Sequence, residues 1–164
     1  MDSEFELELR RLAQAEERGL HDELLSWARD RAIIQKWSDV HVDFQERTWD
    51  GEEYPKPDKI VWKQTGQGHI PDLTGVKNGV LHIVEAKRRG AFYHAETADQ
   101  LRLFSAYAKQ VGGKFELYVD GDAEDAAKQF IRAHGIVAEV VVSDGRYQYE
   151  YWDAVDADCY RDLD

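Results

Sequence analysis

Hydrophobic side chains in the first 36 residues recur at helical spacing. After Gly19, apolar side chains repeat every three to four residues, at Leu20, Leu24, Leu25, Ala28 and Ile33. This spacing places them on one face of an α-helix. The pattern predicts a helical segment broken near Arg18 and Gly19, so that residues 1–19 form a helical extension.

Period-two alternation and short apolar runs predict strands along the rest of the chain. The expected strands span residues 40–49, 60–62, 69–76, 80–87, 115–119, 136–142 and 147–152. Asn78 and Gly79 lie between two of them, and Asn-Gly is a strong hairpin-turn sequence. Strands 69–76 and 80–87 should therefore pair as antiparallel neighbours.

Two further helices are expected between the strands. One spans residues 97–111 and ends at Gly112, and the other spans residues 123–134 and ends at Gly135. Glycine is favoured just beyond a helix end. The order of elements predicts an α/β fold with a central mixed β-sheet flanked by helices.

The length and composition indicate one domain in a reducing compartment. A chain of 164 residues suits a single domain, here residues 1–164 with an acidic tail at 153–164. One cysteine rules out an intramolecular disulfide. No apolar run approaches the roughly 20 residues of a membrane helix, and the N-terminus lacks the regions of a signal peptide. We expect a cytoplasmic protein that does not bind membranes.

The net charge of −12 opposes tight binding to duplex DNA, because nucleic-acid affinity usually comes from Lys and Arg side chains that neutralise phosphates. The charge is unevenly distributed. Residues 84–114 contain six basic and three acidic residues, so this segment is positive in an otherwise acidic chain. The same segment contains the candidate chemistry described next.

The strand at 80–87 ends in two charged side chains on one face. Side chains alternate along a strand, so Glu85 and Lys87 share a face. Asp72 precedes Glu85 by 13 residues, and a hairpin centred on Asn78-Gly79 can bring the two carboxylates together. Mg²⁺ prefers oxygen ligands and completes its shell with water and phosphate. The arrangement predicts a Mg²⁺ site for phosphoryl chemistry, in which Lys87 orients the attacking water or stabilises developing charge.

Pro71-Asp72 followed by Glu85-Ala86-Lys87 resembles the PD-(D/E)xK motif of restriction-endonuclease-like nucleases. The resemblance implies a restriction-endonuclease-like core over residues 20–119. It also implies that Asp72, Glu85 and the backbone carbonyl of Ala86 ligate Mg²⁺, with Mn²⁺ as a substitute. Lys87 would then serve the attacking water.

The same resemblance implies further site residues on two helices. The helix after the motif often carries a Gln and a Tyr that face the site. Gln100 and Tyr107 fit this pattern because they lie seven residues apart. Many members also have a metal-binding Glu on the first helix, for which Glu23 is the candidate and Glu16 and Glu17 are rivals.

Four residues are candidates for contact with nucleic acid. Arg88 and Arg89 continue the motif strand into a basic turn, and Tyr107 and Lys109 lie on the following helix. A solvated loop explains Arg88 and Arg89 as well as a phosphate contact does, and a core position explains Tyr107 equally well. DNA is the preferred partner over RNA, and a homodimer or a larger complex with a basic partner is compatible with the acidic chain.

Three functions follow from these observations. The first is a Mg²⁺-dependent nuclease that hydrolyses DNA phosphodiester bonds in defence, phage biology or repair. The second is a toxin domain of interbacterial competition that cuts DNA or tRNA and is paired with an immunity protein. The third is a catalytically inactive nuclease-like protein used for binding or assembly, which the net charge of −12 favours.

Overall fold

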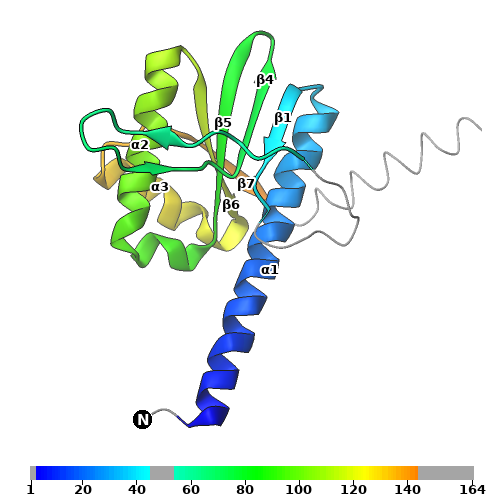
Figure 1. Ribbon diagram of the computed structural model, residues 1–164, viewed down its shortest axis with the longest axis vertical. Coiled ribbons are helices and arrows are strands. Elements are labelled where there is room, and N and C mark those ends of the chain that lie inside the picture. Colours follow the sequence, from blue (N-terminus) through cyan, green and yellow to red (C-terminus); the bar gives the residue numbers. More distant parts are fainter. Residues whose placement is uncertain (1–2, 45–53, 144–164) are drawn as a thin grey trace, which may run out of the picture.

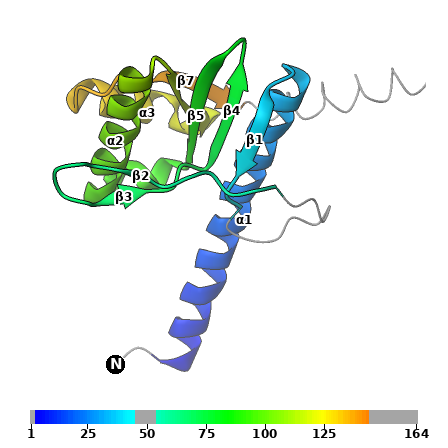
Figure 2. The same ribbon diagram turned by 45° about the horizontal axis from the view of Figure 1, so that its top comes forward.

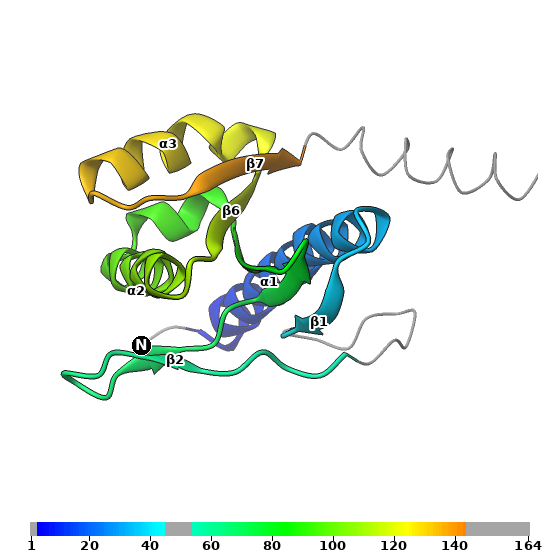
Figure 3. The ribbon, with the colours of Figure 1, turned by 90° about the horizontal axis from the view of Figure 1, so that it is seen from above.

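A five-stranded mixed sheet forms the centre of the protein. The structure, a computed structural model, describes residues 3–44 and 54–143. In these residues one helix covers one face of the sheet and two helices cover the other (Figures 1 and 3). This confirms the α/β class with a central mixed sheet flanked by helices. No helix in the described ranges is long and apolar enough to cross a membrane.

The elements follow the expected order. The helices are α1 (Glu4–Ile34), α2 (Ala95–Val111) and α3 (Glu124–Ala133), with 3₁₀ turns η1 (Arg89–Tyr93) and η2 (Gly121–Ala123). The strands of the main sheet are β1 (Ser38–Val42), β4 (Leu73–Lys77), β5 (Val80–Lys87), β6 (Lys114–Asp120) and β7 (Glu139–Ser143). Strands β2 (Ile60–Val61) and β3 (Gly68–His69) pair separately as a short ribbon beside α2 (Figure 2).

The sheet changes direction at β5. Its spatial order is β1-β4-β5-β6-β7. The pairs β1–β4 and β4–β5 are antiparallel, whereas β5–β6 and β6–β7 are parallel. Helices α2 and α3 connect these parallel strands. Because the three strands run in the same direction, the carboxyl ends of β5, β6 and β7 lie at the same edge of the sheet.

Two hydrophobic clusters fix the helices to the sheet. On one face, Leu25 and Ala28 of α1 pack with Leu73, Val84 and Tyr118. The other face holds a cluster of α2 and α3 side chains with residues from β5 and β6, including Leu101, Phe104, Ala127, Ile83, Leu117 and Val119. Alternate residues of β5 therefore serve the two clusters, as expected of a strand buried on both faces.

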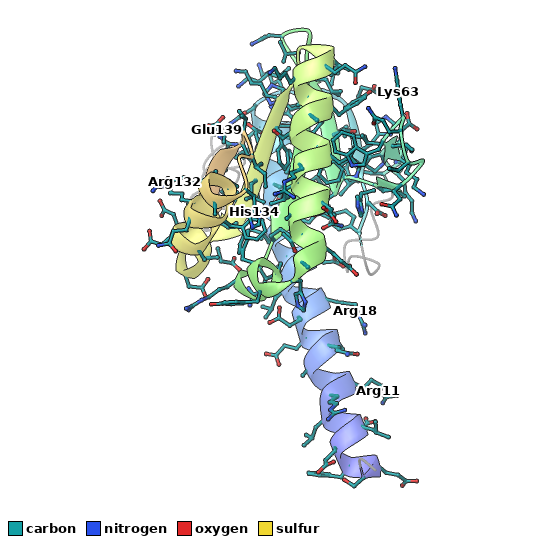
Figure 4. All side chains as sticks on the ribbon, turned by 90° about the vertical axis from the view of Figure 1, so that its left-hand side faces the viewer. Arg11, Arg18, Lys63, Arg132, His134 and Glu139 are labelled. Atoms are coloured by element: carbon teal, nitrogen blue, oxygen red, sulfur yellow. The ribbon has the colours of Figure 1, made fainter. Side chains whose placement is uncertain are left out.

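Helix α1 is continuous, so the expected break near Arg18 and Gly19 is wrong. A glycine inside a helix costs only about 1 kcal/mol relative to alanine. The part of α1 after Gly19 packs against the sheet, and this packing outweighs that cost. Ser3 and Glu6 form a capping box at its start, with Ser3 Oγ accepting from the Glu6 N–H at 3.2 Å. The first half of α1, which carries Arg11, extends beyond the sheet (Figures 1 and 4).

Some expected strands differ from those in the structure. The strand expected at 69–76 is divided, since β3 ends at His69 and β4 begins at Leu73. Pro71 lies in the gap and has no N–H for a ladder. Part of the strand expected at 40–49 lies outside the described residues. The strand expected at 147–152 and the acidic tail at 153–164 lie outside them too.

The β4–β5 hairpin was expected from Asn78 and Gly79 and is confirmed. These residues have φ values of 52° and 76°, the left-handed conformations of a type I′ turn. The register pairs Lys77 with Val80 and continues to Leu73 opposite Val84. One further step in this register places Asp72 opposite Glu85.

Two glycines provide a matched test of this packing. A Cβ built on Gly75 of β4 would lie 2.8 Å from Cε3 of the Trp37 ring, whereas one on Gly19 of α1 meets nothing within 4 Å. Gly75→Ala should lower the free energy of unfolding by about 1–3 kcal/mol because the ring must shift. Gly19→Ala should raise it by about 0.5–1 kcal/mol. Urea unfolding followed by tryptophan fluorescence measures both, and equal effects would contradict the packing.

Candidate functional site

Asp72 and Glu85 lie side by side where β4 begins and β5 ends. Asp72 lies one residue before the first register pair, Leu73 with Val84, and its carboxyl group is hydrogen-bonded to that of Glu85. The two residues are only 5 % and 2 % exposed. Glu85 belongs to the face of β5 that also carries Lys87. Two buried carboxyl groups in contact at the end of an apolar strand need compensating protons or cations.

Two groups converge on one oxygen of Asp72. The backbone N–H of Ala86 donates to Asp72 Oδ2 at 2.9 Å. From α1, His21 Nε2 lies 3.2 Å from the same oxygen and 3.1 Å from the carbonyl oxygen of Ala86. Since both neighbours are acceptors, we assign a proton to Nε2, which donates to both.

Asp72 and Glu85 titrate as a pair. Burial raises the pKa of Glu85 well above its usual value, and the charge of Asp72 adds to that effect. Burial alone would raise the pKa of Asp72 too, but hydrogen bonds from Glu85 and His21 lower it. The two carboxyl groups share a hydrogen bond, which requires a proton, and the raised pKa of Glu85 places that proton on Glu85 rather than on Asp72.

His21 is held between acidic groups. Burial acts to lower the pKa of His21, but Asp72 and Asp22 outweigh it and raise the pKa above the usual value. Its Nδ1 lies 3.6 Å from Asp22 Oδ1, within ion-pair range but beyond hydrogen-bond length. The surroundings of His21 therefore favour its protonated form.

Lys87 is oriented by α2. Its Nζ donates to Gln100 Oε1 at 2.7 Å. This bond joins the carboxyl end of β5 to the first turns of the helix that follows. The ammonium group therefore has a defined position on the same side of the sheet as Glu85, with two donor positions left for water or an anion.

The donor set suits a divalent cation, although it is not preassembled. In the part of the chain that the structure describes, no three His, Cys, Asp or Glu side chains are already spaced to hold a metal ion. Asp72, Glu85 and the Ala86 carbonyl nevertheless offer the oxygen ligands that Mg²⁺ and Mn²⁺ prefer. His21 Nε2 lies within 3.2 Å of two of these groups. A cation bound there would take the place of the proton between Asp72 and Glu85.

The structure does not bring the expected helical acids to Asp72. Glu23 is exposed on α1, and so is Glu16. Glu17 accepts a hydrogen bond from Arg88 Nε at 3.3 Å. The α1 residue that contacts Asp72 is His21.

His21 could have been found from helical periodicity. It precedes Leu24, Leu25 and Ala28 by three, four and seven residues, which places it on the core-facing side of the helix. Glu23 is rotated by about 100° from Leu24 and points outward. Paired histidines at metal-ligand spacing are a recognisable sequence signal, whereas His21 is a single histidine whose partners, Asp72 and Ala86, lie more than 50 residues later in the chain.

The residues expected to contact nucleic acid are separated in the structure. Arg88 is engaged, because it donates to Glu17 and, at 2.5 Å, to Asp120 Oδ2. Arg89 is exposed on η1. Tyr107 packs against the hydrophobic cluster that α2 and α3 form with β5 and β6, whereas Lys109 is exposed in the last turn of α2. Both lie roughly 10 Å or more along the helix from Gln100, so the described contacts do not join them to Asp72 and Glu85.

The shared proton predicts a pH-dependent stability. A carboxyl group whose pKa is raised in the folded protein stabilises the fold at low pH, and that contribution is lost as pH rises through the raised pKa. In metal-free buffer, the free energy of unfolding should therefore fall as pH rises above the ordinary Glu range. Glu85→Gln should be more stable than the wild type at pH 8 but not at pH 4.5. Urea unfolding between pH 4.5 and pH 8 measures the free energy of unfolding of both proteins. An equal dependence on pH in the wild type and in Glu85→Gln would contradict a raised pKa at Glu85.

Comparisons with protein-family models, with curated proteins and with solved structures found no match to this chain.

Proposed function

We propose that this protein is a metal-dependent phosphodiesterase of restriction-endonuclease-like fold that hydrolyses DNA. The observation that carries the proposal is the hydrogen-bonded pair of Asp72 and Glu85, with the Ala86 carbonyl and Lys87 next to them. This is the spatial form of the Pro-Asp and Glu-Ala-Lys motifs. A structural role alone gives no reason to bury two acids beside a lysine that is fixed by Gln100.

The residues divide into ligands and groups that act on the phosphate. Asp72, Glu85 and the Ala86 carbonyl would hold Mg²⁺ or Mn²⁺, with His21 as a further nitrogen donor. When bound, the cation supplies Lewis acidity and lowers the pKa of a coordinated water. Imidazole is a ligand for transition metals more than for Mg²⁺, so His21 favours Mn²⁺.

Lys87 is the residue of this chain that would act on the reacting atoms. Water adds to phosphorus and the bond to the departing sugar oxygen breaks, while negative charge grows on the phosphoryl oxygens. The ammonium of Lys87 can donate to those oxygens or to the attacking water. Gln100 is a positioning residue, since it touches Lys87 Nζ at 2.7 Å. Glu85 must lose its proton before it can serve as a ligand.

A binding protein without catalysis is the second candidate. The observation in its favour is the hydrogen-bonded contact of His21 with both Asp72 and the Ala86 carbonyl, which satisfies these groups without a metal. The net charge of −12 agrees with it. A nuclease toxin that cuts DNA or tRNA would use the same residues as the repair or defence enzyme, so the preferred substrate separates those two.

Cleavage assays test the proposal directly. Plasmid DNA, single-stranded DNA and tRNA are incubated with Mg²⁺ or Mn²⁺, and products are resolved on gels. Lys87→Ala should reduce the rate by about 10²–10³-fold, because a donor to developing charge is worth that much. Asp72→Asn should abolish metal-dependent cutting.

Lys128→Ala is the matched control for Lys87→Ala. Lys128 is a partly exposed lysine on α3 that pairs with Glu124 at 2.8 Å, and its loss should leave the rate unchanged. Cutting that survives in Lys87→Ala and Asp72→Asn would show a contaminating nuclease. Absence of cutting in the folded wild type, on every substrate and with both metals, would favour the binding protein.

A further inference from the structure

The turn that follows Lys87 is held rigidly by its neighbours. Residues 89–93 form η1, which leads directly into α2. Thr97 Oγ1 donates to the carbonyl of Ala91 at 2.6 Å. The Phe92 ring packs against Phe130 of α3, with ring centroids 5.4 Å apart. The backbone of η1 is therefore fixed on both sides, from α2 and from α3.

The two arginines before this turn differ in what they contact. Arg88 is bound to Glu17 and Asp120 and cannot reach a ligand without breaking these ion pairs. Arg89 is exposed, and in residues 3–44 and 54–143 it makes no hydrogen bond or ion pair. Its guanidinium is available two residues from Lys87, within about 7 Å along the backbone.

Tyr93 presents an uncovered aromatic ring at the other end of the turn. It is 77 % exposed, although its neighbour Phe92 is packed against α3. Within the described ranges its ring has no aromatic or cationic contact and its hydroxyl no hydrogen bond. Tyrosine is enriched at binding surfaces because its ring offers an apolar face and its hydroxyl a polar group.

The spacing of the two side chains matches one nucleotide. A 3₁₀ turn rises about 2.0 Å per residue, so Arg89 and Tyr93 start about 8 Å apart. A guanidinium binds phosphate oxygens with two N–H donors, and a phenol ring stacks on a base. Both lie within about 15 Å of Lys87 along the chain, which keeps such a nucleotide close to the proposed reacting phosphate.

The charge of the protein indicates which nucleic acid fits. Duplex binding depends on many neutralised phosphates, and the net charge of −12 opposes it. Bases in a duplex are already stacked on each other, so a protein ring can stack only on an unpaired or flipped base. Arg89 with Tyr93 therefore suits a single strand better than a duplex.

We propose that Arg89 and Tyr93 form a subsite for one unpaired nucleotide of a single-stranded nucleic acid, with Arg89 on its phosphate and Tyr93 stacked on its base. This inference rests on the proposed phosphodiesterase function, whose substrate class it names. The subsite serves a DNA or an RNA strand, because phosphate and base are common to both.

The test is a binding measurement that needs no cleavage. Fluorescein-labelled 12-mers of single-stranded DNA, of RNA and of the matching DNA duplex are titrated by fluorescence anisotropy in EDTA and in Ca²⁺. The variants are then compared with the wild type in whichever of these two buffers gives the tighter binding. The wild type should bind single strands more tightly than the duplex. Tyr93→Ala should weaken single-strand binding about tenfold, and Tyr93→Phe should stay within about twofold of the wild type.

Two matched variants control for general loss of an exposed ring or charge. Phe5→Ala removes a 71 % exposed aromatic ring near the start of α1, and Arg132→Ala removes an exposed arginine on α3 (Figure 4). Both should bind like the wild type. Arg89→Ala should weaken binding and reduce the slope of log affinity against log salt by about one.

Several results would overturn the subsite: no single-strand binding by the wild type, tighter binding of the duplex, unchanged affinity in Tyr93→Ala, or an equal loss in Phe5→Ala. These outcomes are separable from the fate of the proposed function. Tyr93-dependent binding without any cleavage supports the subsite and removes the phosphodiesterase. Cleavage that depends on Asp72, together with unchanged single-strand affinity in Tyr93→Ala, supports the phosphodiesterase and removes the subsite.

Discussion

The burial of two adjacent carboxyl groups at one end of the β4–β5 hairpin is the constraint on which the structure depends. Two charges of the same sign cannot both ionise in contact and away from water without a large cost. Asp72 and Glu85 avoid that cost by sharing a proton and by attracting His21. Apolar residues at both positions would satisfy the sheet more simply. Perturbed pKa values of this kind cluster at functional sites, which is why the pair carries our functional proposal.

The long helix α1 is part of the same arrangement. His21 contacts the carbonyl of Ala86 near the middle of the helix. Ten residues later, Arg31 Nη1 donates to the hydroxyl of Tyr118 at 2.5 Å, and Tyr118 is the β6 partner of Ala86 in the sheet register. The helix is therefore attached to the β5–β6 pair by two polar contacts, with Trp27 packed edge-on against Tyr118 between them. Docking of α1 determines whether His21 can occupy its position.

Local rules predicted most of the fold. Asn78-Gly79 determined the hairpin, Gly112 marked the end of α2, and the apolar run before Glu85 identified the buried strand. Gly19 was misleading because one helix-weakening residue does not break a helix that packs along its length. The motif spacing also predicted Asp72, Glu85 and Lys87 as a group, and in the structure the two acids are hydrogen-bonded to each other. It could not reveal His21, whose importance depends on how α1 lies against the sheet, nor the engagement of Arg88 by two distant acids.

Proton release on metal binding tests most directly whether Asp72 and Glu85 with the Ala86 carbonyl form a cation site. Mn²⁺ is titrated calorimetrically at neutral pH in two buffers of different ionisation enthalpy. Because the pKa values of Glu85 and His21 are raised, a cation that binds between them competes with protons. Mn²⁺ binding should therefore release protons, and Asp72→Asn should not bind Mn²⁺. Absence of binding in the folded wild type, or binding that Asp72→Asn leaves unchanged, would contradict the cation site.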